Sequence, residues 1–229
     1  MKTTLLSVLF LLMSINAAFS GIDIDTVKFQ EDGKDKKYHI EIYYPKIRNA
    51  STESTRDFNK LISEFVDAKK AGFMKDLNSV DYDDRLPYEF YVNYEVGYSG
   101  INFVSVVLYL YYFEGGAHGS SVAFSFNYDL DYNRNIKLSD LFDGNYLDII
   151  SDFCKAELMK DSENADADWV NEGAGPKAEN FETFTLNEEG LIIHFQQYQV
   201  LPYVAGAPDV FIPEKVLKNV VRKDGLLMR

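Results

Sequence analysis

The chain has 229 residues, a hydrophobic share of 46% and a formal net charge of -13 at neutral pH. This length suits one large domain or two small ones with a real core. The acidity excludes nucleic acid and anionic lipid as expected partners and favours a cationic one, although solubility alone would also explain it. Because Cys154 is the only cysteine, no intrachain disulfide can form, and stability must come from packing.

The N-terminus has the features of a secretory signal peptide. Lys2 precedes an apolar run over residues 5–15, and small residues at Ala18 and Ser20 mark a cleavage site before Gly21. The run is well short of the roughly 20 residues that a membrane-spanning helix needs. We therefore predict that residues 1–20 are removed, that the mature protein does not insert into the membrane, and that it is periplasmic or extracellular.

Periodicity predicts the elements of the first half of the chain. Residues 22–30 and 38–44 read as strands, the second ending at Pro45. Apolar residues recur at helical spacing over 54–77, where Ser54 and Asp57 resemble a capping box. After an acidic linker over 79–85, residues 88–98 alternate as a strand, and residues 101–113, apolar on both faces, predict the central strand.

The second half predicts a further strand over 121–128 with a small, polar face, and then a helix over about 146–160. Residues 161–180 read as an acidic loop, followed by strands over 181–186, 191–200 and 209–212 and a terminal helix from Glu214. These elements predict one compact α+β unit: a mostly antiparallel, aromatic-rich sheet with the 54–77 and 146–160 helices packed on it.

The candidate ligand-binding residues are few. Two aromatic runs flank a glycine-rich segment, and the only tryptophan lies in the acidic loop; together they give Glu114, Gly115, Gly116, His118 and Trp169. Paired glycines let backbone amides approach a ligand, and a histidine beside a carboxylate can act as a general base. The same glycines could instead serve a tight turn, with the imidazole bonded to nearby backbone. Both interpretations stay open.

Catalytic and metal signatures are missing from the sequence. There is no nucleophile elbow, phosphate-binding loop, dinucleotide fingerprint or paired-histidine zinc motif. The acidic run from Asp129 to Asp140 has calcium-loop spacing, but Arg134 occupies the position that needs glycine, so we predict an ordinary turn. Cys154 lies on an apolar helical stripe and is expected to be a buried, inert thiol. We therefore assign no catalytic residue, metal or cofactor.

Two sequence blocks carry a family resemblance. The first is YFEGGAHGSSVAFSFNYDL, residues 112–130, followed by IKLSDLF at 136–142; the second is FTLNEEGLIIHFQQYQVLPYVAGAPDVFIP, residues 184–213. They resemble the C-terminal domain of RsiV-type anti-sigma factors and PdaC-type peptidoglycan deacetylases. The part from YHIEIYYP through the 54–77 helix resembles the companion domain that usually precedes it. The resemblance implies a division into residues 21–98 and 99–229, which we expect to form one compact unit.

The resemblance also implies a function at the cell envelope. RsiV-type proteins bind lysozyme as receptors, whereas this sequence has no second apolar span, sigma-binding segment or deacetylase domain. We therefore expect a non-catalytic exported binding module whose partner is a basic, lysozyme-type muramidase or peptidoglycan. Two alternatives remain: a cell-wall polysaccharide hydrolase using His118 and a carboxylate such as Glu114, and a structural domain of an exported assembly. The oligomeric state is open.

Overall fold

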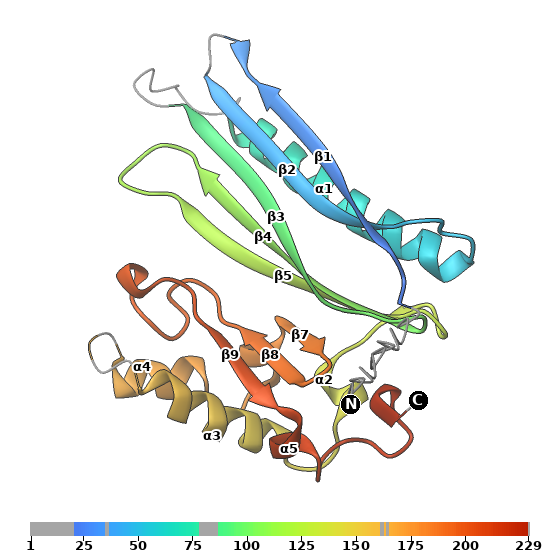
Figure 1. The fold of residues 1–229 in the computed structure, drawn as a ribbon. Helices are drawn as coiled ribbons and strands as arrows, with labels where there is room; N and C mark the ends of the chain where they lie inside the picture. The colour runs from blue at the N-terminus through green and yellow to red at the C-terminus, as the bar shows by residue number, and fades with distance from the viewer. Residues whose placement is uncertain (1–20, 35–36, 78–86, 161–162, 164, 229) are drawn as a thin grey trace, which may run out of the picture.

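The computed structural model describes residues 21–34, 37–77, 87–160, 163 and 165–228, so the predicted signal peptide and the acidic linker lie outside the described residues. The strands form two sheets, a six-stranded sheet in sequential order and a three-stranded sheet below it (Figure 1). The described residues also contain five α-helices, α1 to α5. The α+β class and the mostly antiparallel pairing are confirmed.

The first sheet is built from sequential strands around one long crossover. Neighbouring strands are antiparallel except β2 and β3, which are parallel and are joined through helix α1, Glu53–Leu77, as a parallel pair requires. The strand expected to be central is flanked on both sides. The bounds are β1 Ile24–Asp32, β2 Tyr38–Ile47, β3 Tyr88–Ser99, β4 Phe103–Phe113, β5 Ser120–Asp129 and β6 Arg134–Asn135.

Helix α1 covers one face of the first sheet through an apolar interface. Its buried residues recur at helical spacing and meet the apolar faces of β2 to β5. Phe73 stacks on Phe90 with ring centroids 5.4 Å apart, and Phe65 packs edge-on against Phe124 and Phe126. This layer is the first of two hydrophobic cores.

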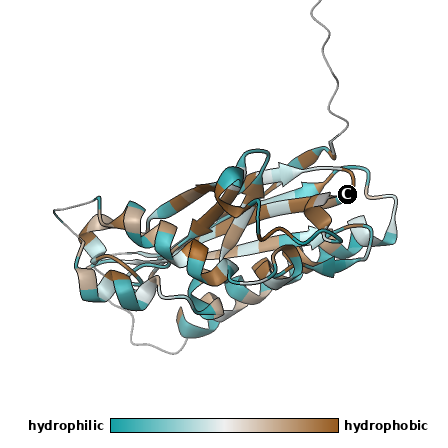
Figure 2. Ribbon diagram, turned by 90° about the horizontal axis from the view of Figure 1, so that it is seen from below, coloured by the Kyte–Doolittle hydropathy of each residue, from teal (hydrophilic) through white to brown (hydrophobic). Residues whose placement is uncertain are grey.

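The second core lies under the smaller sheet. Strands β7 Phe184–Asn187, β8 Gly190–His194 and β9 Asp209–Pro213 pack on helix α3, Tyr146–Leu158, whose buried face includes Ile150 and Cys154. Seen from below, hydrophobic stretches lie among hydrophilic outer turns (Figure 2). Each predicted main helix thus packs on its own sheet, because the strands divide into two groups.

The two sheets meet edge to face. Strand β7 is the edge strand of its sheet, and side chains of β4 and β5 satisfy its free backbone groups. Leu186 N donates to Ser105 Oγ at 2.8 Å, and Phe184 O accepts from Asn127 Nδ2 at 2.8 Å. Asn127 Oδ1 in turn accepts from Ser105 Oγ at 2.6 Å. The small, polar face predicted for β5 is therefore where the second sheet docks.

Several predicted boundaries are wrong for local reasons. Strand β2 runs through Pro45 to Ile47. Its pairing with β3 ends at Ile42, so no hydrogen bond to β3 is lost at Pro45, which has no backbone N–H to donate. Helix α1 is capped by Thr52, whose Oγ1 accepts from Thr55 N at 3.2 Å, and not by the predicted capping box at Ser54.

Three predictions in the C-terminal half need the same kind of correction. The predicted acidic loop contains helix α4, Ala167–Gly173, begun by Asp166, which accepts from Trp169 N. Strand β8 ends at His194, since glutamine side chains hold the chain that follows. The terminal helix α5, Glu214–Leu217, is a single turn because Val221 instead bridges to Phe142. The remaining short helix is α2, Leu138–Leu141.

Candidate binding surface

The Gly-Gly-Ala-His segment forms the turn between β4 and β5. Gly115 and Gly116 have φ values of 89° and 98°, which favour glycine, so the tight-turn role of the pair is confirmed. His118 is exposed, and its Nδ1 lies 3.0 Å from Gly119 O. Because a carbonyl oxygen only accepts, Nδ1 carries the proton. Partial burial, with the negative charge of Asp76, raises the pKa of the neighbouring Glu114.

An aromatic row connects this turn to the only tryptophan. The His118 ring stacks on Tyr203 with centroids 4.1 Å apart, and Tyr203 lies 5.8 Å from the ring of Tyr198. The indole of Trp169 on α4 donates from Nε1 to Tyr198 O at 2.9 Å. We call Trp169, Tyr198, Tyr203 and His118 the aromatic row. The structure thus brings together two of the predicted site residues that are 51 positions apart in the numbering.

The aromatic row adjoins the face of the first sheet that α1 leaves uncovered. Tyr111 lies against Gly119, where a β-carbon would come within 2.3 Å of the tyrosine ring. Tyr111 stacks on Tyr91 at 5.8 Å, and Tyr91 lies 5.7 Å from His39. The β2–β3–β4 register places carboxylates beside these rings. We call His39, Glu41, Glu89, Tyr91 and Tyr111 the open face.

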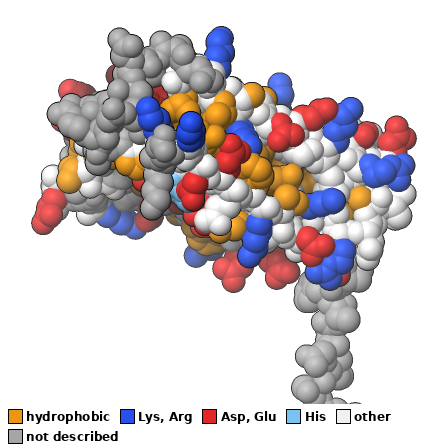
Figure 3. All heavy atoms as spheres, turned by 90° about the horizontal axis from the view of Figure 1, so that it is seen from above, with side chains coloured by type: hydrophobic (Ala, Val, Ile, Leu, Met, Phe, Trp, Pro, Cys, Tyr) orange, Lys and Arg blue, Asp and Glu red, His pale blue; other side chains and the backbone are white. Residues whose placement is uncertain are grey.

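Negative charge dominates the open face. Burial, then the charge of Glu89, raises the pKa of both Tyr91 and Tyr111, and Glu41 adds to the effect on Tyr91. The pKa of His39 is raised chiefly by its hydrogen bond to Asp32 at 2.6 Å. Seen from above, acidic and basic side chains are interspersed with hydrophobic ones (Figure 3).

The predicted acid-base pair is not assembled in the structure. Among the described residues, no hydrogen bond joins the Glu114 carboxylate to the His118 imidazole, whose Nδ1 proton goes to backbone. The pKa of Glu114 is raised, as a general acid would need, but its causes are burial and Asp76. The arrangement lacks the geometry for transferring a proton between these two groups.

A second histidine has triad-like distances. His194 is buried between the sheets, with Nδ1 2.8 Å from Asp209 Oδ1 and Nε2 2.8 Å from Thr185 Oγ1. Tyr109 OH donates to Asp209 Oδ2 at 3.3 Å. In a hydrolase the hydroxyl faces the substrate. Here Thr185 is 2% exposed whereas the Asp209 side chain is 45% exposed. The hydroxyl is therefore the buried end of the cluster and the carboxylate is the exposed end, the reverse of a hydrolase triad. This cluster fixes β7 to β8 and offers no accessible nucleophile.

Other predicted features fold as structural elements. Cys154 is fully buried, and burial raises the pKa of its thiol to about 12. Asp129 accepts from the backbone amides of Asp131 and Tyr132, which makes the expected turn. Over the described ranges no group of three or more acidic, histidine or cysteine side chains could hold a metal ion.

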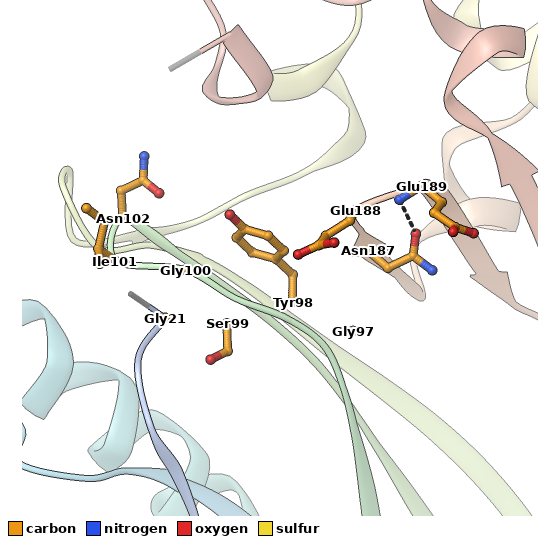
Figure 4. Close-up of a pocket in the computed structure, with 10 residues that line it drawn as sticks. All are labelled: Gly21, Gly97, Tyr98, Ser99, Gly100, Ile101, Asn102, Asn187, Glu188 and Glu189. Carbon is orange, nitrogen blue, oxygen red and sulfur yellow. Dashed lines mark hydrogen bonds between the residues drawn. The ribbon is translucent and has the colours of Figure 1, made fainter. Parts of the chain in front are cut away.

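Sequence reasoning missed a hollow of about 460 Å³ between two turns. Figure 4 shows Tyr98 between the β3–β4 turn and Glu188, and Gly21 also lines the hollow. Asn187 Oδ1 accepts from Glu189 N at 2.9 Å. The sequence marks both turns, but only the docking of the two sheets brings them together. Tyr198 and Tyr203 were missed for the same reason, since their only signal was the density of aromatic residues.

Two family models match the chain. One is described as "Deacetylase PdaC", over residues 31–121, and the other as "Protein of unknown function (DUF3298)", over residues 139–215. The peptidoglycan-N-acetylmuramic acid deacetylase PdaC of Bacillus subtilis is 28% identical over 212 residues, which are 91% of this chain and 43% of that protein. The immunogenic protein MPT64 of Mycobacterium tuberculosis is 23% identical over 82% of this chain and 79% of its own length.

Solved structures agree with the fold. A DUF3298 family protein of Pseudomonas aeruginosa has a TM-score of 0.68 and 16% identity, covering 89% of this chain and 96% of its own. One from Bacteroides fragilis has a TM-score of 0.64 and 17% identity, covering 88% and 94%. The predicted resemblance to PdaC-type proteins is confirmed, while the RsiV link and the division at residue 98 stay predictions. The chain spans less than half of the length of the Bacillus deacetylase.

Proposed function

Because the chain carries a PdaC-type domain followed by a DUF3298 domain, we propose that it is an exported, non-catalytic binding module of the bacterial cell envelope. We further propose that its protein partner is a basic muramidase of the lysozyme type, which docks on the open face. The observation that carries this proposal is the pairing of half-buried aromatic rings, Tyr91 and Tyr111, with carboxylates on a sheet face that no helix covers.

The charges of the open face support a cationic partner. Glu41 and Glu89 flank Tyr91, so an arginine or lysine side chain placed over that ring would meet both a π face and two carboxylates. Asp32 adds a further negative charge beside His39. On the neighbouring strand β1, Lys28 lies over the Tyr43 ring at 5.6 Å. Electrostatic complementarity of this kind speeds association and makes it sensitive to salt.

An envelope location is supported by the name of one relative. The Bacillus relative is by its name a peptidoglycan deacetylase, and its similarity to this chain extends over 91% of the chain at 28% identity. In the described part of the chain, no helix is long and apolar enough to cross a membrane. A hydrolase remains the alternative, but no hydrogen bond between Glu114 and His118 is present among the described residues, and the hydroxyl of the His194 cluster is buried.

The proposal is tested by replacing the carboxylates of the open face with uncharged amides of the same size. In the variant Glu41→Gln/Glu89→Gln, two carboxylates are lost and hydrogen bonding at both positions is kept. We expect its affinity for a basic lysozyme to fall about tenfold, mostly through slower association. The matched control is Glu53→Gln/Glu64→Gln on α1, which has the same change in net charge on the opposite side of the sheet. Equal affinities of the two variants would contradict docking on the open face.

A further inference from the structure

We propose that the aromatic row is a second binding site, which holds an uncharged glycan strand of N-acetylated amino sugars by ring stacking. This site rests on the envelope location in the proposed function but does not depend on the muramidase. It uses different residues and a different kind of interaction from those of the open face.

Tyr198 gives the strongest indication of a ligand. It has a φ of 65°, although a bulky aromatic residue is disfavoured in this left-handed region. Its side chain is nevertheless 48% exposed, so packing in the core does not explain the conformation. Residues held in this way concentrate at ligand-binding positions. Here the strained backbone presents a large ring to solvent.

The neighbouring rings are held rigid by contacts to backbone. Tyr203 OH and His118 Nδ1 lie 3.4 and 3.0 Å from the same acceptor, Gly119 O, and their rings are stacked at 30°. A β-carbon at position 119 would come within 2.3 Å of Tyr111, so glycine is needed there for close packing. A ligand that stacks on these rings would therefore lose little affinity to the ordering of side chains.

Trp169 is fixed to the same site from a different element. Asp166 caps α4, and the Trp169 indole donates to Tyr198 O, which ties the helix to the strained residue. Around this residue, Gln199 Nε2 donates to Gly173 O and to Asn180 O, both at 2.9 Å. The segment that carries Tyr198 is thus clamped on both sides, as the persistence of a strained conformation requires.

The chemistry of the row fits a sugar better than a protein. A pyranose ring presents a face of C–H groups, which the electron-rich faces of tyrosine and tryptophan attract, and a rim of hydroxyls that stays hydrated. None of the contacts described for these four side chains is an ion pair with a carboxylate, so a salt-independent interaction is expected. Val204, beside Tyr203 and 83% exposed, supplies an apolar contact for the methyl group of an acetamido substituent.

Trp169 is the only tryptophan, so its fluorescence reports on this site alone. We would titrate residues 21–229 with chitohexaose, an uncharged polymer of N-acetylglucosamine, at about 0.05 M and about 0.5 M salt. The expected result is a saturable change in emission with the same dissociation constant at both salt concentrations. Cellohexaose, which lacks acetamido groups, is expected to bind at least about tenfold more weakly.

Variants separate this site from the rest of the surface. Tyr198→Gly removes the ring and relieves the backbone, so it should bind chitohexaose about tenfold more weakly without a fall in melting temperature. Tyr203→Ala should weaken binding similarly. Tyr132→Ala, at an exposed tyrosine outside the row, is the control and should bind as the parent does. The Glu41→Gln/Glu89→Gln variant should also bind chitohexaose with the affinity of the parent. The glycan site and the muramidase site are therefore tested independently, and one proposal can be refuted while the other stands.

Three results would overturn the assignment. One is the absence of any change in emission or heat up to millimolar chitohexaose. Another is undiminished binding by both Tyr198→Gly and Tyr203→Ala, which would place the glycan elsewhere. Equal affinity for cellohexaose would refute the N-acetylated sugar as the ligand class.

Discussion

The two faces of the first sheet hold their neighbours by different physical means. On one face, α1 contributes phenylalanine and aliphatic side chains to a layer of hydrocarbon. On the other, β7 stands on β4 and β5 through Ser105, Ser125 and Asn127, which bond to its backbone. Apolar layers tolerate changes that conserve volume, whereas buried polar contacts need every partner in place. The polar interface between β7 and strands β4 and β5 is therefore the one that sets the position of the aromatic row relative to the first sheet.

The apolar interface should show the larger loss from one substitution. Phe73→Ala removes a fully buried ring that stacks on Phe90, and we expect it to lower the free energy of unfolding by about 3 to 5 kcal/mol. Urea denaturation measures the change. Phe29→Ala, at a ring that is already 38% exposed, is the comparison and should cost much less. Similar losses for the two would mean that burial under α1 does not govern stability.

A substitution in the polar interface should destabilise the protein by leaving buried hydrogen-bonding groups without partners. Asn127→Ala deprives the Ser105 hydroxyl of its acceptor and Phe184 O of its donor, so we expect a loss of about 2 to 3 kcal/mol. Asn93→Ala, at an exposed position on β3, should change stability by less than about 0.5 kcal/mol. In the double variant with Phe73→Ala the losses should add, because the two interfaces are far apart. Strong coupling would contradict their independence.

A smaller effect is expected where the sheets approach most closely. A β-carbon at Gly97 would come within 2.5 Å of Leu186 O, which is backbone and cannot rotate away. Gly97→Ala should therefore cost about 1 to 3 kcal/mol by pushing β7 from the sheet. Gly72→Ala, with no atom within 4 Å of the added carbon, should be neutral or stabilising because it lies within a helix. Unchanged stability of Gly97→Ala would mean that β7 docks less closely.

The smallest effect concerns pH at the open face. The folded-state pKa of His39 is raised, chiefly by Asp32, so its stabilising contribution is fully present below about pH 6.5 and is lost as pH rises through the higher folded value. The parent should thus exceed His39→Gln in melting temperature by more at about pH 5.5 than at about pH 9. Because the pair is near the surface, the difference should shrink in high salt. A pH-independent difference would show that the ion pair contributes nothing.

The same contrast explains how much of the fold could be predicted from sequence. The apolar layer is local in origin: Phe58, Ile62 and Val66 repeat at helical spacing, and β3 alternates residue by residue. The polar interface is non-local. Ser105 and Asn127 look like ordinary residues of two strands, and the β7 residue that Asn127 contacts, Phe184, lies 57 positions later in the sequence. For that reason the sequence predicts two helices and an antiparallel sheet, but not the division into two sheets.

For the candidate site, too, the sequence predicts individual residues but not how they are brought together. The glycine pair marks a turn because positive φ values are rare in other residues, and Trp169 stands out by being unique. Nothing in the sequence connects them, because Tyr198 lies on a segment that reads as a strand and Tyr203 lies on the connection that follows it. The acidity of the chain is visible in its composition, but its concentration around Tyr91 depends on the strand register.

The central claim, that a basic muramidase docks on the open face, is tested most directly by calorimetric titration of residues 21–229 with a basic lysozyme at low and moderate salt. We predict saturable binding that weakens but persists at the higher salt, and that falls about tenfold further in Glu41→Gln/Glu89→Gln. The absence of heat, or an attraction that vanishes with salt and is the same in the charge-matched α1 control, would contradict the account.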